Sequence, residues 1–130
     1  MSREGSMSES TGPLVKAEDA AVVQTPFADI LWHCHAQNST LGHLAFGTAT
    51  FPKGGGHASH RHPNAEEFIY VVSGKATQAV VDETFDMGPG DCAHIPRDAV
   101  HSTMNVGDGE LVILVGFSAA DPETIDLDPA

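Results

Sequence analysis

The sequence predicts an all-β fold, and three observations support this prediction. Thirteen Gly and eight Pro are spread between short apolar runs, as many turns joining many short strands require. Turn-forming clusters, such as residues 52–55 and 88–91, separate these runs. No helical hydrophobic period of useful length and no internal repeat is present. Because 130 residues are enough to bury a core, we expect a single folded domain.

The expected strands follow in chain order, each limited by a turn signal. Residues 30–35 and 44–51 are the first two, and the Pro-Lys-Gly-Gly turn ends the second. The run Phe-Ile-Tyr-Val-Val at 68–72 has high β propensity, and the turn at 73–75 leads into the next strand. The remaining expected strands are residues 76–81, 92–95, 101–105 and 111–117.

The two ends of the chain differ in composition from this central part. Residues 1–20 are expected to be a disordered polar leader, because Ser, Glu, Gly and Thr dominate its first half and leave nothing to bury. Residues 21–118 are expected to form the single folded domain. Residues 119–130 are expected to be an acidic C-terminal tail of similar character to the leader, with a short helical turn near residues 122–125.

Charge and composition exclude several classes of partner. The formal net charge of −12 would repel nucleic acid phosphates and an anionic membrane surface, so neither is expected as a partner. No apolar stretch approaches the roughly 20 residues of a membrane span, and no signal peptide is evident. Cys34 and Cys92 form no metal-knuckle pattern and are expected to be small buried hydrophobes. We therefore expect a soluble, cytoplasmic protein.

The most informative motif is His60-x-His62, followed by Glu67. In a strand, residues i and i+2 point to the same face, so the two imidazoles can reach one ion side by side. Imidazole and carboxylate ligands suit a borderline or hard divalent ion, namely Mn, Fe, Ni, Co, Cu or Zn. The motif thus predicts one divalent transition metal in each subunit.

The wider spacing resembles a known family. Gly54-x5-His60-x-His62-x4-Glu67-x6-Gly74 is followed by Gly90-x5-Pro96-x-Asp98-x2-His101-x3-Asn105. These patterns are similar to the two motifs of the cupin superfamily, and the resemblance covers roughly residues 40–117. It implies a jelly-roll β-barrel, also called a double-stranded β-helix, of the small single-domain type. It also implies that His60, His62, Glu67 and His101 are the metal ligands.

One position of the second motif departs from the family pattern, because Asp98 stands where the family usually has Gly. Asp is among the few other residues that tolerate a left-handed backbone, so we expect the turn to be kept. Strand alternation from Glu67 sends Ile69 and Val71 inward, which gives the site an apolar wall. Phe68, Tyr70 and Val72 would then face a second sheet or a partner subunit, while Thr103 and Asn105 would point inward like His101.

Several residues near these motifs have two interpretations. His57 is either a solvated loop residue, which we favour, or a group that moves protons beside the metal, which makes it the candidate catalytic residue. His33 and His35 either face the interior as acid–base groups or lie at a subunit edge in water, and we favour the edge. Arg97 is a candidate for binding a substrate carboxylate at the barrel mouth. Glu66 is expected at the surface. An alternative ligand register, in which Glu66 is one of the metal ligands, is left open.

The expected function is that of a metal-dependent enzyme acting on a small oxygenated metabolite, in the dioxygenase, isomerase or lyase class. Three His and one Glu would leave open positions on the ion for a chelating substrate. The alternative is a non-catalytic cupin domain that binds or senses a small ligand. A jelly-roll of this length has open sheet edges, and residues 21–35 are apolar enough to cover one, so a homodimer is expected.

Overall fold

The computed structural model describes residues 12–127, and half of these residues lie in β-strands. A single 3₁₀ turn, η1 (Ala17–Asp19), precedes them. The strands are β1 (Ala21–Gln24), β2 (Asp29–Cys34), β3 (Ala45–Phe51), β4 (Gly56–Arg61), β5 (Glu67–Ser73), β6 (Ala76–Val80), β7 (Glu83–Met87), β8 (Cys92–Ile95), β9 (His101–Asn105), β10 (Leu111–Phe117) and β11 (Ile125–Asp126). The described part of the chain contains no helix of the length and apolarity that a membrane crossing requires.

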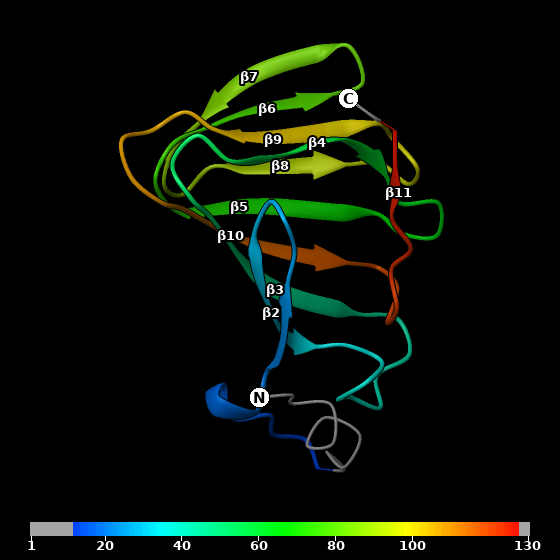
Figure 1. The fold of residues 1–130 in the computed structure, drawn as a ribbon. Coiled ribbons are helices and arrows are strands. Elements are labelled where there is room, and N and C mark those ends of the chain that lie inside the picture. Colours follow the sequence, from blue (N-terminus) through cyan, green and yellow to red (C-terminus); the bar gives the residue numbers. More distant parts are fainter. Residues whose placement is uncertain (1–11, 128–130) are drawn as a thin grey trace.

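Two antiparallel sheets enclose the core (Figure 1). The six-stranded sheet has the order β1-β2-β3-β10-β5-β8, and the five-stranded sheet has the order β11-β4-β9-β6-β7. Neighbours in these sheets are mostly distant in sequence, as when β10 pairs with both β3 and β5. This architecture confirms the predicted all-β jelly-roll fold.

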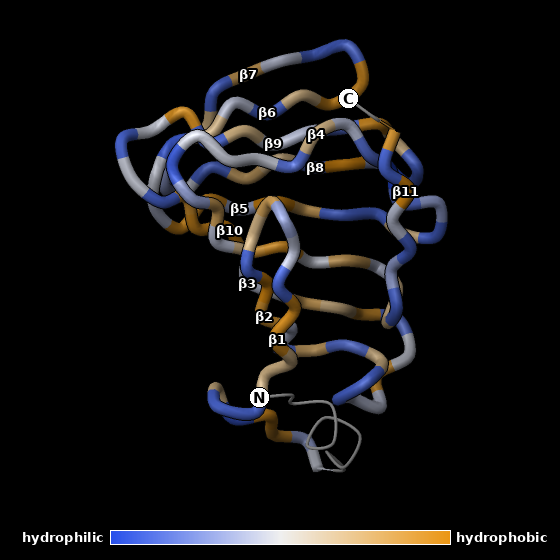
Figure 2. The backbone as a smooth tube through the Cα atoms, in the orientation of Figure 1, coloured by the Kyte–Doolittle hydropathy of each residue, from blue (hydrophilic) through white to orange (hydrophobic). Residues whose placement is uncertain are grey.

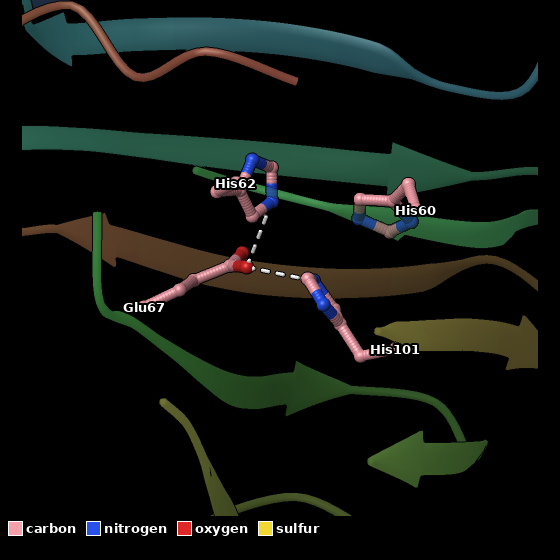
Figure 3. Close-up of side chains that lie close together, drawn as sticks. All are labelled: His60, His62, Glu67 and His101. Atoms are coloured by element: carbon pink, nitrogen blue, oxygen red, sulfur yellow. Dashed lines mark ion pairs between the residues drawn. The ribbon is translucent and has the colours of Figure 1, made fainter. Parts of the chain in front are cut away.

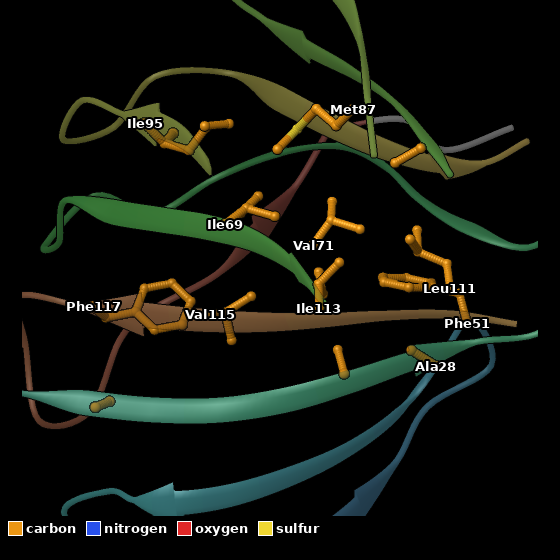
Figure 4. Close-up of a cluster of buried hydrophobic side chains, with 14 of the residues drawn as sticks. Ala28, Phe51, Ile69, Val71, Met87, Ile95, Leu111, Ile113, Val115 and Phe117 are labelled. Carbon is orange, nitrogen blue, oxygen red and sulfur yellow. The ribbon is translucent and has the colours of Figure 1, made fainter. Parts of the chain in front are cut away.

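The alternation predicted for β5 sets the inner and outer faces of the large sheet. Ile69 and Val71 are buried in the core, beside Ile113 and Val115 of the neighbouring strand β10 (Figure 4). The intervening side chains of β5, including Phe68, are exposed on the outer face. The backbone coloured by hydropathy is apolar along β5 and β10 and more polar along β7 (Figure 2). The first residue of β5, Glu67, therefore points into the interior as predicted.

All the strands predicted from apolar runs are present within one residue at each end. The structure adds β1, whose short apolar run was not predicted as a strand of its own, and β4, β7 and β11, which lack a continuous apolar run. β4 is polar because ligand-type residues occupy its inward positions, and β7 is exposed at all but its last residue. When the buried face of a strand carries polar side chains, its sequence lacks the hydrophobic alternation by which a strand is predicted.

The tight turns adopt the conformations that the motif implies. Gly74, between β5 and β6, has φ of +93°, and a Cβ there would lie 2.6 Å from the carbonyl oxygen of Glu110. Asp98 has φ of +64°, so the residue that departs from the family pattern keeps the left-handed turn. Its carboxylate also accepts a hydrogen bond from Arg61 at 2.7 Å.

The C-terminal segment differs from the expected acidic tail. Residues 125–126 form β11, which pairs with β4 in register with Arg61 and His60. No helical turn forms near residues 122–125, which corrects that expectation, because the backbone there is extended and bonded to β4. Residues 1–11 of the predicted leader and the last residues of the tail, 128–130, lie outside the described residues.

Candidate metal centre

Four side chains from three strands and one loop converge inside the barrel. His60 lies on β4, His62 follows the end of that strand, Glu67 begins β5 and His101 begins β9. β4 and β9 pair directly, with His60 opposite His101. One ligand atom from each residue lies within 4.8 Å of all the others, and all four residues are buried (Figure 3). Arg61, between His60 and His62 in sequence, turns outward to Asp98.

Each histidine of this cluster has its Nδ1 atom fixed by a backbone carbonyl. Nδ1 of His60 donates to Ala58 O at 2.8 Å, and Nδ1 of His101 donates to Ala99 O at 2.9 Å. Nδ1 of His62 donates to Glu123 O at 2.9 Å. A proton on Nδ1 leaves the lone pair of the neutral ring on Nε2. The chain therefore sets the tautomer in which all three rings can bind a cation through Nε2.

The atoms aimed at the centre of the cluster have no other partner. Oε1 of Glu67 lies 3.1 Å from Nε2 of His62 and 2.9 Å from Nε2 of His101. Within the described residues 12–127, these three buried atoms have no hydrogen-bond partner. Unsatisfied buried polar groups are costly. A divalent cation between them would satisfy all three, so the residues present fit such an ion.

The electrostatics of the cluster also favour a cation. Burial, together with the neighbouring His101 and His57, lowers the pKa of His60 to about 3, so this ring stays neutral in the folded protein. Burial opposes the charge on Glu67, but its contacts with His101 and His62 hold the pKa of that carboxyl below its usual value. Burial likewise opposes charge on His62, but its contact with Glu67 raises the pKa of this ring, so a bound cation would have to displace the proton that the metal-free site favours there. Neutral imidazole and ionised carboxylate are the forms that bind metal.

His57 lies beside the cluster and not in solvent, which corrects the favoured interpretation of this residue. Its ring stacks on that of His60 with centroids 3.5 Å apart and on Phe27 at 4.0 Å. Its Nε2 donates to the carboxylate of Asp126 at 2.8 Å. Residues three apart in a regular strand face opposite sides, but the β4–β9 register shifts between His57 and His60. This bulge turns both rings inward.

A cavity of about 340 Å³ opens on the cluster. The polar lining of the cavity comprises three of the ligand candidates, His60, His62 and Glu67, together with neighbouring groups such as His57 and Asp126, and the rest of its wall is mainly apolar and aromatic. Apolar lining with a few convergent polar groups is the usual form of a small-molecule site. The inward alternation predicted from Glu67 and His101 is confirmed by Ile69 and Thr103, which both line this cavity.

The C-terminal segment forms part of the site. Asn64 holds it through two hydrogen bonds, donating from Nδ2 to Asp121 O at 3.1 Å and accepting at Oδ1 from Glu123 N at 2.9 Å. Glu123 O in turn accepts from the ring of His62, and Asp126 accepts from His57. Sequence reasoning missed Glu123 and Asp126, because their composition indicated only an acidic tail, and it assigned no role to Asn64 in the loop between His62 and Glu67.

The other histidine candidates do not line the cavity. His33 contacts Thr48, with 2.7 Å between Nε2 and Oγ1. His35 is nearly buried beyond the end of β2, packs against Trp32 and lies 3.4 Å from a carboxylate oxygen of Asp121. His35 is therefore not a solvated edge residue, and neither ring takes part in the cluster.

The remaining candidates lie outside the cavity as well. Arg97 is exposed and does not line the cavity, which corrects its suggested place at the mouth. Glu66 is exposed, as expected. Cys92 is exposed and Cys34 is half-buried, so neither is the buried hydrophobe that was expected.

Comparison with known proteins yields one family. The family model described as "Cupin domain" matches residues 47–117. The polyketide synthase CurC of Streptomyces cyaneus is 36% identical over 66 residues, which cover 51% of this chain and 43% of that protein. The oxalate decarboxylase OxdC of Bacillus subtilis is 34% identical over 79 residues, covering 57% of this chain and 20% of OxdC. The chain thus spans less than half the length of both relatives.

Solved structures of the same kind share the fold. The formate complex of oxalate decarboxylase from Lactobacillus farciminis superposes with a TM-score of 0.80 at 24% identity, covering 89% of this chain and 37% of that chain. A Bacillus subtilis oxalate decarboxylase structure, determined in a study of its Mn(II) centres, superposes with a TM-score of 0.79 at 23% identity, covering 89% and 33%.

Proposed function

The chain belongs to the cupin family, and we propose that it is a metal-dependent enzyme acting on a small oxygenated metabolite. The observation that carries this proposal is the convergence of four buried ligand atoms, three of them without a hydrogen-bond partner, at the wall of a cavity. His60, His62, Glu67 and His101 would hold the ion. Four protein ligands on an ion that accepts five or six leave positions for oxygen atoms of a substrate.

A divalent metal bound here would supply Lewis acidity, or oxygen activation if it is Fe, Cu or Mn. Zn, Co and Ni also fit the donor set, since imidazole and carboxylate discriminate weakly among these ions. Reaction classes compatible with such a centre are those of dioxygenases, isomerases and lyases. The similarity to an oxalate decarboxylase supports an enzymatic role for the fold.

Among the residues of the chain, His57 would move protons. Its Nε2 donates to Asp126, so the lone pair of the neutral ring lies on Nδ1, which is the atom able to accept a proton. Asp126 would stabilise the resulting imidazolium and hold the ring in place, as carboxylates do for histidine bases in other enzymes. Burial lowers the pKa of His57, which favours the neutral form that a base requires.

The apolar wall would exclude water from the centre and strengthen electrostatic interactions there. The test is a screen of protein loaded separately with Mn, Fe, Ni, Cu, Co or Zn against a panel of small oxygenated metabolites, followed by oxygen uptake and NMR. We expect at least one compound to be consumed, with loss of turnover in Glu67→Gln and slower turnover in His57→Phe. Tight binding without consumption of any compound would instead support the non-catalytic sensing function.

A second copy of the chain is the proposed partner. The outer face of the six-stranded sheet exposes Phe68, Tyr70 and Val72 of β5, and a hollow of about 660 Å³ lies beside Phe46 and Phe68. A chain of net charge −12 can approach its own copy most easily through a mainly apolar face, and Glu66 is the exposed carboxylate at this hollow. The homodimer would bury this face and leave the metal centre, on the inner side, accessible.

A further inference from the structure

We propose that the cavity takes a neutral, ring-containing ligand with two adjacent oxygens and that it disfavours small dianions such as oxalate. This inference rests on the proposed metal-dependent function, because the oxygens of the ligand would approach the ion. It concerns the substrate class of the same site. Two independent properties of the cavity wall support the inference, namely the distribution of charge and the arrangement of aromatic rings.

The first property is the absence of a cationic side chain. Among residues 12–127, no Lys or Arg lines the cavity, and its charged residues are the carboxylates Glu67 and Asp126. Arg61, although it lies next to two ligand candidates in sequence, is held outside by Asp98 at 2.7 Å. A divalent ion would balance the two carboxylates. A dianionic ligand would then bring two uncompensated charges into an apolar environment, which is costly.

The second property is the aromatic wall beside the cluster, where Phe27 stacks on His57 and Phe117 packs edge-on against His62. Phe27 and Phe51 lie roughly parallel, with ring centroids 6.4 Å apart and planes at 25°. Trp32 and Phe117 pack at 5.8 Å and 50° on another part of the same wall. Flat faces of this kind favour stacking or edge contacts with another ring. The polar groups gather near the metal centre, so the ligand would have a chelating end and an apolar ring.

The cavity volume sets the size of this ligand. About 340 Å³ lies at the low end of the range for small-molecule sites, so a compound of one or two fused rings fits better than an extended chain. Oxalate, with no ring, would leave the aromatic wall without a partner. The two properties therefore favour the same class of compound, a hydroxyketone, enol or 1,2-diol on a planar ring.

The test compares maltol, a neutral hydroxyketone on a planar ring, with oxalate on Mn(II)-loaded protein. Calorimetry gives the affinity of the protein for each probe. Each affinity is divided by the affinity of the same probe for free Mn(II), so that the ratio measures what the cavity contributes to binding. Trp32 is the sole tryptophan and lines the cavity, so its emission locates the binding. We expect the corrected affinity for maltol to exceed the corrected affinity for oxalate by roughly tenfold or more.

A charge substitution with a matched control tests the electrostatic part. Val23 lines the cavity and is 41% exposed, whereas its neighbour Val22 is 46% exposed on the same strand and does not line it. Val23→Arg should raise the affinity for oxalate by roughly tenfold, because a cation then faces the dianion, and should leave maltol nearly unchanged. Val22→Arg should change neither.

Each outcome bears on a different claim. Metal retention, measured first for each of the six candidate ions, decides the proposed function: if wild-type protein retains none of them, that function fails and this inference fails with it. If metal is retained but oxalate binds as well as maltol after correction, the substrate class is wrong and the metal centre stands. Retained metal with no binding of either probe, or no effect of Val23→Arg on oxalate, also overturns the inference.

Discussion

Nδ1 of His62 donates a hydrogen bond to the carbonyl oxygen of Glu123, 61 residues later in the chain, at 2.9 Å. A candidate metal ligand is thus oriented by the C-terminal segment and not only by its own strand. The side chain of Asn64, two residues after His62, bonds the backbone of the same segment at both Asp121 and Glu123. Removal of the segment should therefore affect the metal centre more than the barrel.

Deletion of residues 121–130 should lower metal affinity by roughly 10–100-fold, the usual effect of losing a partner that orients a metal-binding histidine. Deletion of residues 128–130 alone is the matched control and should have no effect, because the contacts to His62 and His57 remain. Calorimetric titration with Mn(II) measures both, and circular dichroism checks the fold. Equal affinities for the two truncated proteins would contradict this role of the segment.

Glu67→Gln should weaken metal binding more strongly than the truncation, by more than roughly 100-fold. The substitution keeps the shape of the side chain but removes the anionic ligand atom that lies about 3 Å from two imidazoles. Glu66→Gln, at an exposed neighbouring position, is the control and should bind like the wild type. Weak binding in Glu66→Gln with normal binding in Glu67→Gln would indicate the alternative ligand register.

Acid should destabilise the metal-free protein through His60. The folded-state pKa of His60 is about 3, against an ordinary value of 6.5, so the unfolded chain binds this proton first as the pH falls. Stability from this group is complete above about pH 6.5 and decreases toward pH 3, with a loss of about 2 kcal/mol between pH 7 and pH 5.

The measurement for His60 is urea unfolding of chelator-treated protein at pH 7 and pH 5. The pKa shifts of His62 and Glu67 also change the stability over this pH interval. The comparison is therefore made with His60→Gln, in which His62 and Glu67 are both retained. The wild type should lose about 2 kcal/mol more than the variant over this interval. An identical pH dependence for both proteins would show that His60 does not stay neutral in the fold.

The proposed homodimer predicts a mass of two chains by light scattering at micromolar concentration. Tyr70→Glu, on the exposed outer face of β5, should give a monomer, because it places a charge in the apolar interface. Glu83→Gln, on the exposed strand β7, is the control and should remain dimeric. Metal binding should survive in both variants. A monomeric wild-type protein would contradict the proposed interface.

The sequence predicted the apolar part of the fold because strand alternation is directly visible there. The run at 68–72 gave both the strand and its inner face, and the four ligand candidates followed from the resemblance to the two cupin motifs. β4 was not visible in the same way, since its inward positions are filled by His57 and His60 and not by apolar residues. Periodicity detects burial only when the buried groups are hydrophobic.

The environment of the centre could not be predicted for a different reason. The position of His57 depends on a bulge that has no sequence signal of its own, and a regular strand would have turned the ring away. Glu123 and Asp126 act through pairing with β4, a contact between segments far apart in sequence. The composition of this segment indicates only an acidic tail. Its residues become part of the site because the backbone of β11 pairs with β4.

The measurement that tests the central claim most directly is the metal content of protein purified without chelator or nickel, determined by elemental mass spectrometry. The comparison is between wild type, His60→Ala, and His94→Ala as the control at an exposed histidine of β8. About one divalent transition metal ion per chain in wild type and His94→Ala, lost in His60→Ala, is the predicted result. Equal metal in all three proteins, or none in folded wild type after incubation with each candidate ion, would contradict the account.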